Sequence, residues 1–216
     1  MSPTDRQLVT RIARRYPTYY LRGYARGKLR SDPVYEAVRV RLDGSELPVL
    51  DIGCGIGLCA LYLREHGFTA PITGIDPDAS KITAAQRVAG DDAGLAFEAR
   101  DGAETLPVNG HVLILDVLHY FQPDVRRQVL ERLASQIPAG GWCIIRATPA
   151  DGSWRFRCTQ WEERFAHAIR WMRRPVVAFP RREEVVAPFE AAGFACEVRP
   201  LWGRTPFNSY LFAFRR

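Results

Sequence analysis

The sequence has no stretch of about eighteen consecutive apolar residues, which is the minimum for a helix that crosses a membrane. Residues 1–15 are polar and have a helical pattern, unlike the apolar centre of a secretory signal peptide. Internal repeats, low-complexity segments and a domain linker are also missing. We therefore expect a single folded unit with appendages that stays in the cytoplasm, where it is made.

Cysteine is scarce and badly spaced for cross-linking or metal binding. The five cysteines are an odd number, and they form neither a Cys-x-x-Cys motif nor a Cys/His metal spacing. We expect reduced thiols and no metal site. The 216 residues are 47% hydrophobic, which is enough for a sizeable core.

The net charge of +6 is unevenly distributed along the chain. Counted by segment, it is +7 over residues 1–41, −7 over residues 42–140 and +6 over residues 141–216. Two interpretations fit this pattern. The basic ends are either solvated helix faces or a rim that attracts an anionic substrate, a carrier protein or a membrane surface.

Hydrophobic periodicity predicts an α/β fold. The expected helices are 5–16, 19–30, 33–42, 58–66, 79–88, 123–136 and 181–192, and the expected strands are 49–52, 72–75, 96–99, 112–115, 142–146, 195–201 and 210–214. Strands that alternate with helices imply a parallel sheet covered on both faces, whereas the last two strands follow each other and should form an antiparallel hairpin. We expect a helical cap over residues 1–47 and a main domain over 48–216, with an insertion at about 148–180.

The insertion contains a further helical pattern with an apolar stripe. Its members, at helical spacing, are Trp154, Cys158, Trp161, Phe165, Ile169 and Met172. Such a stripe is more often part of a core than of a site. If it is partly exposed, it forms an apolar lid or a surface that lies on a membrane.

A strand that runs into three alternating glycines is the central motif. It places Asp51 before a turn that contains Gly53, Cys54, Gly55 and Gly57. A nicotinamide dinucleotide fingerprint would need its third glycine at Leu58, so the spacing is G-x-G-x-G instead. Asp51 would also repel a pyrophosphate, whereas it suits a ligand that carries an ammonium and a sulfonium.

Two more carboxylates follow the next two strands. Asp76, with Pro77 after it, ends the second strand and could accept both hydroxyls of a ribose. Asp101, with Gly102 after it, follows the third strand and could accept an adenine amino group. Each alone is typical of a loop cap. Three carboxylates at the ends of successive strands, with Asp51 as the first, indicate a nucleoside site.

These motifs resemble those of the class I S-adenosylmethionine-dependent methyltransferases in order and spacing, over about residues 48–147. The matching runs are residues 50–57, 75–77, 101–107, 117–120 and 138–141. The resemblance implies a Rossmann-like, seven-stranded, mostly parallel sheet with an antiparallel C-terminal hairpin. It also implies S-adenosylmethionine as the cofactor and S-adenosylhomocysteine as the product.

The resemblance further implies where the cofactor binds. The backbone from Gly53 to Gly57 would lie along the methionine moiety, and Asp51 would lie close to its amino group, partly through water. Asp76 would hold the ribose and Asp101 the adenine, and Asp116 would lie beside the cofactor. An N-terminal tyrosine or arginine often closes over the methionine carboxylate in related enzymes, and Tyr19 and Arg22 are our candidates among the cap residues.

Methyl transfer from a sulfonium needs alignment and removal of water, and it needs a base only for a protonated acceptor. His119 is the first candidate base and Asp116 the second. A histidine at this position often lines the cofactor pocket without moving a proton, so that role stays open.

Two missing motifs narrow the substrate. No Asn/Asp-Pro-Pro-aromatic run follows the fourth strand, which disfavours methylation of DNA bases or protein glutamine. An Asp-Asn pair for Mg²⁺ is also missing, so we expect metal-independent chemistry. The leading hypothesis is O-methylation of a small apolar or carrier-bound metabolite, as in secondary metabolism, by a monomer or homodimer.

Three alternatives remain. The basic ends would also suit an RNA methyltransferase, although the sequence contains no recognised RNA-binding module. The chain could instead be a non-catalytic subunit that binds the cofactor. A nicotinamide dehydrogenase is disfavoured by Asp51 and by the glycine spacing.

Overall fold

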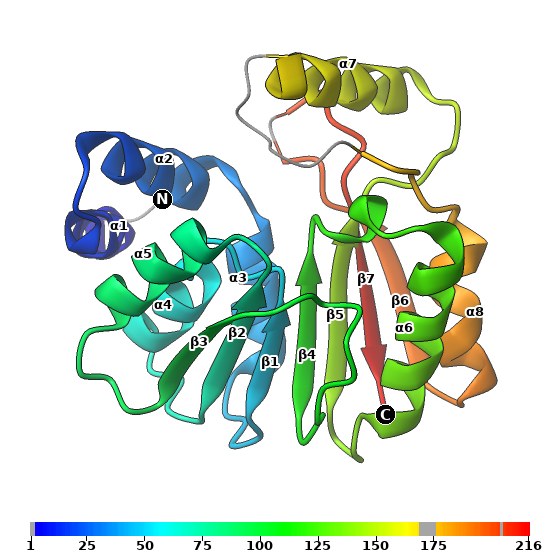
Figure 1. The fold of residues 1–216 in the computed structure, drawn as a ribbon, viewed down its shortest axis with the longest axis horizontal. Coiled ribbons are helices and arrows are strands. Elements are labelled where there is room, and N and C mark those ends of the chain that lie inside the picture. Colours follow the sequence, from blue (N-terminus) through cyan, green and yellow to red (C-terminus); the bar gives the residue numbers. More distant parts are fainter. Residues whose placement is uncertain (1–2, 169–175, 204) are drawn as a thin grey trace. The chain divides into compact units, whose positions relative to one another are not determined.

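The computed structural model describes residues 3–168, 176–203 and 205–216. The chain divides into two compact units, Met1–Gly102 and Ala103–Arg216. Its seven strands have the order β3-β2-β1-β4-β5-β7-β6 in one sheet (Figure 1). This order confirms the predicted Rossmann-like α/β fold.

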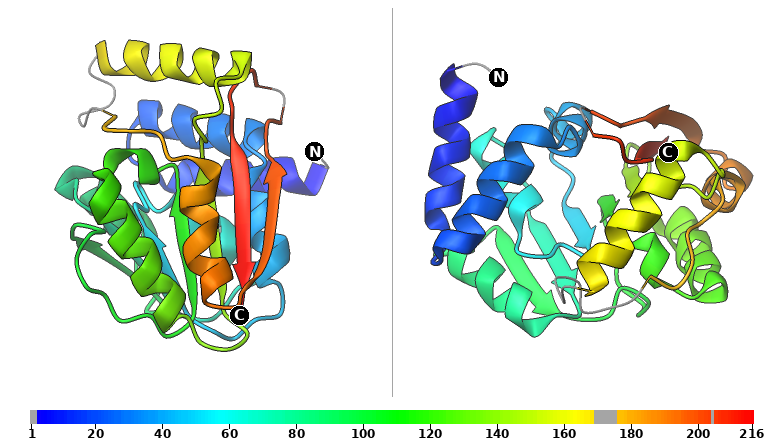
Figure 2. Two further views of the ribbon diagram at one scale, coloured as in Figure 1. Left: turned by 90° about the vertical axis from the view of Figure 1, so that its right-hand side faces the viewer. Right: turned by 90° about the horizontal axis from the view of Figure 1, so that it is seen from above.

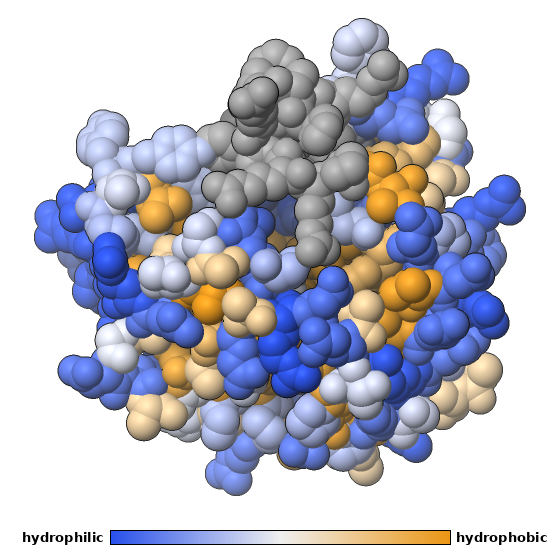
Figure 3. Space-filling model, in the orientation of Figure 1, coloured by the Kyte–Doolittle hydropathy of each residue, from blue (hydrophilic) through white to orange (hydrophobic). Residues whose placement is uncertain are grey.

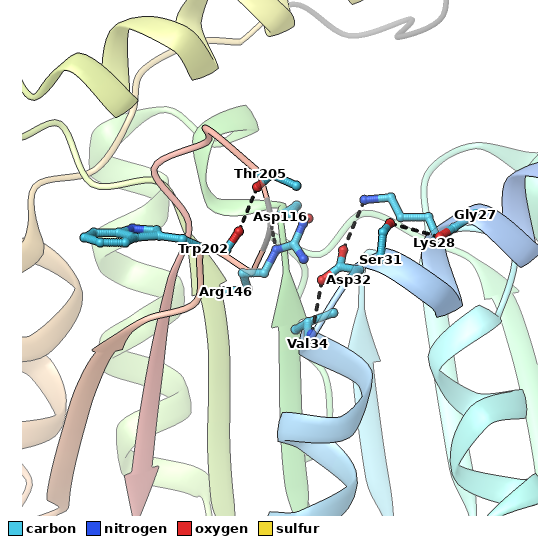
Figure 4. A network of polar contacts seen from close by, with 9 residues as sticks. All are labelled: Gly27, Lys28, Ser31, Asp32, Val34, Asp116, Arg146, Trp202 and Thr205. Atoms are coloured by element: carbon cyan, nitrogen blue, oxygen red, sulfur yellow. Dashed lines mark hydrogen bonds and ion pairs between the residues drawn. The ribbon is translucent and has the colours of Figure 1, made fainter. Parts of the chain in front are cut away.

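The first unit begins with three helices, α1 (Pro3–Arg15), α2 (Tyr19–Ser31) and α3 (Val34–Leu42). Thr18 caps α2, because its hydroxyl accepts a hydrogen bond from the amide of Leu21 at 3.1 Å. Asp32 connects α2 to α3 by accepting from the amide of Val34 and the ammonium of Lys28, at 3.1 and 3.4 Å (Figure 4). A side-chain cap thus sets where α2 begins, and Asp32 fixes the turn from α2 into α3.

The rest of the first unit alternates strands with helices. The elements are β1 (Val49–Ile52), α4 (Leu58–Glu65), β2 (Ile72–Asp76), α5 (Ala79–Ala89) and β3 (Leu95–Ala99). β2 pairs in parallel with both β1 and β3, with Asp51 opposite Gly74 and Asp76 opposite Ala99. All four residues of β1 are buried, Asp51 included, as is usual for an inner strand of a parallel sheet.

The second unit contains β4 (His111–Leu115), the short 3₁₀ helix η1 (Leu118–Tyr120), α6 (Pro123–Gln136), β5 (Trp142–Ala147), α7 (Trp154–Ala168), α8 (Arg182–Ala191), β6 (Ala195–Pro200) and β7 (Tyr210–Arg215). β4 and β5 are parallel, whereas β7 is antiparallel to both β5 and β6. The predicted C-terminal hairpin is therefore confirmed, and β7 is its inner strand. η1 has too few residues to show a periodic pattern, and the sequence did not predict it.

Helix α7 lies beyond one end of the β6–β7 hairpin (Figure 2, left). The guanidinium of Arg155 lies over the rings of Trp154 and Trp202, 4.7 and 4.3 Å from their centroids. It also donates to the carbonyl of Thr205 at 2.7 Å. These contacts hold the first turn of α7 to the loop between β6 and β7.

Of the two interpretations of the apolar stripe of α7, core or partly exposed surface, two of its members fit the second. Trp154 is 61% exposed and Trp161 is 76% exposed, because the residues of α7 with buried side chains, such as Thr159, lie on another face. The side chain of Phe165, and residues Ile169 and Met172, lie outside the described part of the chain.

Hydrophilic residues cover most of the face drawn in Figure 3, and hydrophobic residues form small separate patches between them. Within the described ranges, no helix combines the length and apolar character that crossing a bilayer requires.

Candidate functional site

The glycine turn of the first unit has a left-handed backbone at all three of its glycines. The φ angles are +78° at Gly53, +56° at Gly55 and +75° at Gly57, a region that L side chains rarely adopt. The amides of Gly53 and Cys54 both donate to the carbonyl of Ile75, at 2.7 and 2.9 Å. The turn is therefore tied to the end of β2.

Close packing explains Gly57, whereas open space surrounds Gly55. A Cβ on Gly57 would lie 2.9 Å from the ring of Phe97 and 3.2 Å from the Cβ of Ala85. A Cβ on Gly74 would lie 2.7 Å from the same ring. A Cβ on Gly55 would have nothing within 4 Å, so its backbone is accessible to a ligand.

Asp51 is a buried carboxylate at the start of this turn. It is only 2% exposed. Burial, with a smaller contribution from the negative charge of Asp76, raises the pKa of Asp51 to about 7. A cation close to Asp51 would stabilise the carboxylate and reverse this shift.

Asp76 already accepts hydrogen bonds from two backbone amides. Its oxygens accept from Gly55 at 3.1 Å and from Asp78 at 2.9 Å, and the ammonium of Lys81 lies 4.0 Å away. The side chain is buried, whereas Pro77 beside it is exposed. The carboxylate is thus fixed next to the glycine turn.

The third strand end is more open. Asp101 is half-buried and Gly102 is buried, in the segment that follows β3. Both belong to the first unit, as do Asp51, Asp76 and the three turn glycines. The structure therefore brings most of the predicted cofactor residues together in one unit.

The cap contributes a residue that the sequence had not singled out. Tyr16 is fully buried, and its hydroxyl donates to the carbonyl of Ile56 inside the glycine turn at 3.1 Å. Arg22 donates through Nε to the backbone carbonyl of Tyr16 at 2.7 Å. Tyr19, in contrast, is 90% exposed. The roles predicted for Tyr19 and Arg22 at the methionine carboxylate stay predictions.

Asp116 and Arg146 form an ion pair in the second unit (Figure 4). Arg146 Nε donates to Asp116 Oδ1 at 2.7 Å, and its Nη2 donates to Oδ2. Asp116 has a φ of +60°, which is unusual for a residue with a side chain, and its amide donates to the carbonyl of Arg146 at 3.0 Å. Both carboxylate oxygens of Asp116 are therefore held by one guanidinium.

His119 lies in a group of aromatic rings of the second unit. Its ring centroid is 4.1 Å from that of Tyr120 and 5.6 Å from that of Phe179, which makes an edge contact with Phe156. Burial lowers the pKa of His119 to about 4, with Arg126 and Arg146 acting in the same direction and Asp116 against it. The imidazole is therefore neutral at neutral pH, and the same burial makes it a weaker base than an exposed histidine.

Arg126 fixes the backbone around His119. It is 2% exposed, and it donates to the carbonyl of Leu118 at 3.4 Å, to that of Ala178 at 2.8 Å and to the carboxylate of Glu184 at 2.7 Å. The amide of Val177 donates to the carbonyl of His119 at 2.9 Å. These bonds hold η1 against the segment before α8.

The sequence analysis missed Gly74 and Phe97, which pack at the glycine turn. It also missed Arg126 and Arg146, which bind the residues around His119 and Asp116. The only signal was indirect, because a glycine inside a strand pattern marks a close approach. Across the described ranges, no three His, Cys, Asp or Glu side chains gather in a way that could hold a metal ion.

Residues 49–141 match a family model described as a methyltransferase domain. Among solved structures, magnesium protoporphyrin IX methyltransferase (ChlM) from Synechocystis PCC 6803, with bound S-adenosylhomocysteine, has a TM-score of 0.66 at 20% identity, over 99% of this chain and 95% of that one. N-methyltransferase NodS from Bradyrhizobium japonicum WM9, also with S-adenosylhomocysteine, has a TM-score of 0.62 at 18% identity, over 84% of each chain.

An O-methyltransferase family protein from Burkholderia thailandensis has a TM-score of 0.63 at 20% identity, over 85% of this chain. The chain spans just over half the length of that structure, 55%, and a similar share, 56%, of a structure from Nostoc punctiforme PCC 73102. No curated protein matches the chain.

Proposed function

We propose that the chain, whose residues 49–141 match a methyltransferase domain model, binds S-adenosylmethionine at the glycine turn and methylates a small acceptor. When bound, this cofactor supplies an electrophilic methyl group on a sulfonium. The solved methyltransferases of the same fold that contain its demethylated product support this assignment.

The observation that carries the proposal is the environment of Asp51. A carboxyl group that is 2% exposed and has a pKa of about 7 gains most from a neighbouring cation. An ammonium supplies that charge, whereas a pyrophosphate would add repulsion. The carboxylate at the glycine turn therefore fits a nucleoside that carries an amino-acid group better than a dinucleotide.

The remaining cofactor contacts follow from the positions of the residues. The accessible backbone at Gly55, with Gly53, Cys54 and Gly57 around it, would receive the methionine moiety. Asp76 and Pro77 would bind the ribose, and Asp101 and Gly102 the adenine. Tyr19 would approach the carboxylate, and Asp116 is the remaining predicted cofactor contact.

His119 is the better of the two candidate bases. Its ring is neutral at neutral pH but accepts a proton only weakly, because burial disfavours the imidazolium, whereas both oxygens of Asp116 already accept hydrogen bonds from Arg146. The rings of Tyr120, Phe179 and Phe156 beside it exclude water, which raises the reactivity of an acceptor oxygen. We therefore propose O-methylation in which His119 accepts the hydroxyl proton.

We also propose an apolar or carrier-bound acceptor. The exposed indoles of Trp154 and Trp161 would cover it as part of a lid over about residues 148–180, and the basic residues of the two ends would attract an acidic carrier. In this arrangement residues 1–47 form the cap and residues 48–216 the catalytic domain.

A pair of experiments tests the function. The first is calorimetric titration with S-adenosylhomocysteine and with NAD, for which we expect micromolar binding of the former only. Tight binding of NAD, or none of either ligand, would contradict the proposal. The second is incubation with S-adenosylmethionine and candidate hydroxylated acceptors or total RNA, read by a mass increase of one methyl group. A methylated RNA, or binding without any product, would favour the RNA or the non-catalytic alternative.

A further inference from the structure

The hydroxyl of Tyr16 contacts the glycine turn at Ile56. It donates to the carbonyl of Ile56 at 3.1 Å from a side chain that is fully buried. Burial raises the pKa of Tyr16 well above its usual value, so the hydroxyl keeps its proton and stays a donor.

The bond from Tyr16 fixes one peptide plane. The carbonyl of Ile56 and the amide of Gly57 belong to the same peptide unit, and that amide donates to the carbonyl of Cys54 at 3.0 Å. The glycines on both sides of Ile56 have positive φ angles, +56° and +75°, and glycine resists rotation of its neighbouring peptides least of all residues. Two hydrogen bonds, one at each side of the peptide between Ile56 and Gly57, therefore hold this peptide in one orientation. Without them, the flanking glycines would let it rotate.

Arg22 acts on the same point from helix α2. Its Nε donates to the backbone carbonyl of Tyr16 at 2.7 Å, which is a short, charge-assisted bond. A chain of two hydrogen bonds therefore runs from α2 through Tyr16 to Ile56.

We propose that Tyr16 is a positioning residue that preorganises the glycine turn for the methionine moiety, and that Arg22 acts on the cofactor through Tyr16. This inference rests on the proposed function, because it takes the glycine turn as the cofactor site. It assigns Arg22 a role other than direct contact with the ligand carboxylate.

A matched pair of hydroxyl deletions tests the role of Tyr16. Tyr16→Phe removes the bond to Ile56 and keeps the ring, and Tyr62→Phe removes a hydroxyl bond of 3.0 Å to Glu36 elsewhere in the same unit. We expect the Kd for S-adenosylhomocysteine to rise about three- to tenfold in Tyr16→Phe, as loss of one neutral hydrogen bond predicts, and to stay unchanged in Tyr62→Phe. The KM for the acceptor should not change in either. Equal Kd values in wild type and Tyr16→Phe would overturn the inference.

A double-mutant cycle separates the two roles of Arg22. If Arg22 acts through Tyr16, then Arg22→Met weakens binding in the wild-type background by about threefold or more, and by less than about twofold in the Tyr16→Phe background. Additive losses would show that Arg22 contacts the ligand itself and would refute this part of the proposal.

A readout without ligand keeps the inference separate from the proposed function. Hydrogen exchange at the amides of Gly55 and Gly57 in the free protein should be at least about threefold faster in Tyr16→Phe than in wild type and Tyr62→Phe. Unchanged exchange would count against Tyr16 whatever the ligand is. Failure of the wild type to bind S-adenosylhomocysteine would instead refute the proposed function.

Discussion

Replacing Asp51 by asparagine should stabilise the free protein and weaken the cofactor complex. The carboxyl is 2% exposed, and its pKa is about 7 in the folded chain against 3.8 for an unperturbed group. Because the folded state binds a proton more tightly than the unfolded state, the wild type loses stability as the pH rises from about 4 to about 7. At 1.36 kcal/mol per unit of pKa, the loss reaches about 4 kcal/mol above the folded pKa.

Asparagine has nearly the same shape and no charge, so it avoids this loss. Urea unfolding of the free proteins should therefore show Asp51→Asn more stable than wild type at about pH 8, by at most about 4 kcal/mol. This advantage should shrink by about 2 kcal/mol on acidification to about pH 5.5, where the wild-type carboxyl is almost fully protonated in the native state but still ionised in the unfolded state. Asp91→Asn, at an exposed position, is the control and should show no such trend.

Cofactor binding should change in the opposite direction. At about pH 8, Asp51→Asn should bind S-adenosylhomocysteine at least about tenfold more weakly, because the ammonium loses its charged partner. In wild type the affinity should rise with pH up to about 7 and then level off. A stability difference that does not vary with pH would refute the argument, since it would mean that Asp51 is not a desolvated carboxylate.

Three further predictions follow from other parts of the structure. Gly57→Ala should abolish cofactor binding and destabilise the fold by more than about 1 kcal/mol, because the added methyl group meets Phe97 at a positive φ angle. The control Gly27→Ala, inside α2, should be neutral or stabilising in thermal unfolding. Arg126→Met should cost about 3 kcal/mol in urea unfolding, since it leaves buried carbonyls without a donor; an effect below about 1 kcal/mol would contradict its anchoring role. His119→Gln should lower kcat for a hydroxylated acceptor about a hundredfold with the Kd for S-adenosylhomocysteine unchanged, and a near-normal kcat would restrict His119 to lining the site.

Much of the fold could be predicted from the sequence. The boundaries of β1 and α6 match the periodic pattern, and the other strands and helices whose ends are described differ by one or two residues. The resemblance to methyltransferases is confirmed by the family model over residues 49–141 and by the fold. Local patterns suffice here because alternation of strands and helices leaves few topologies for a parallel sheet.

The sequence by itself determined the parts that depend on spacing along one strand or turn. Asp51 lies near the end of β1 and Asp76 ends β2, and the ends of neighbouring parallel strands share one edge of the sheet. The sequence therefore places both carboxylates beside the glycine turn. Glycine at positions 55 and 57 is likewise explained by the turn itself, because both residues need positive φ angles.

Only the tertiary structure decided the contacts between distant residues and their electrostatics. The pairing of Asp116 with Arg146 joins residues 30 positions apart. The bond from Tyr16 to Ile56 joins residues 40 positions apart. The raised pKa of Asp51 likewise comes from burial in three dimensions. Hydrogen bonding and desolvation depend on which atoms meet in space, and periodicity along the chain does not contain that information.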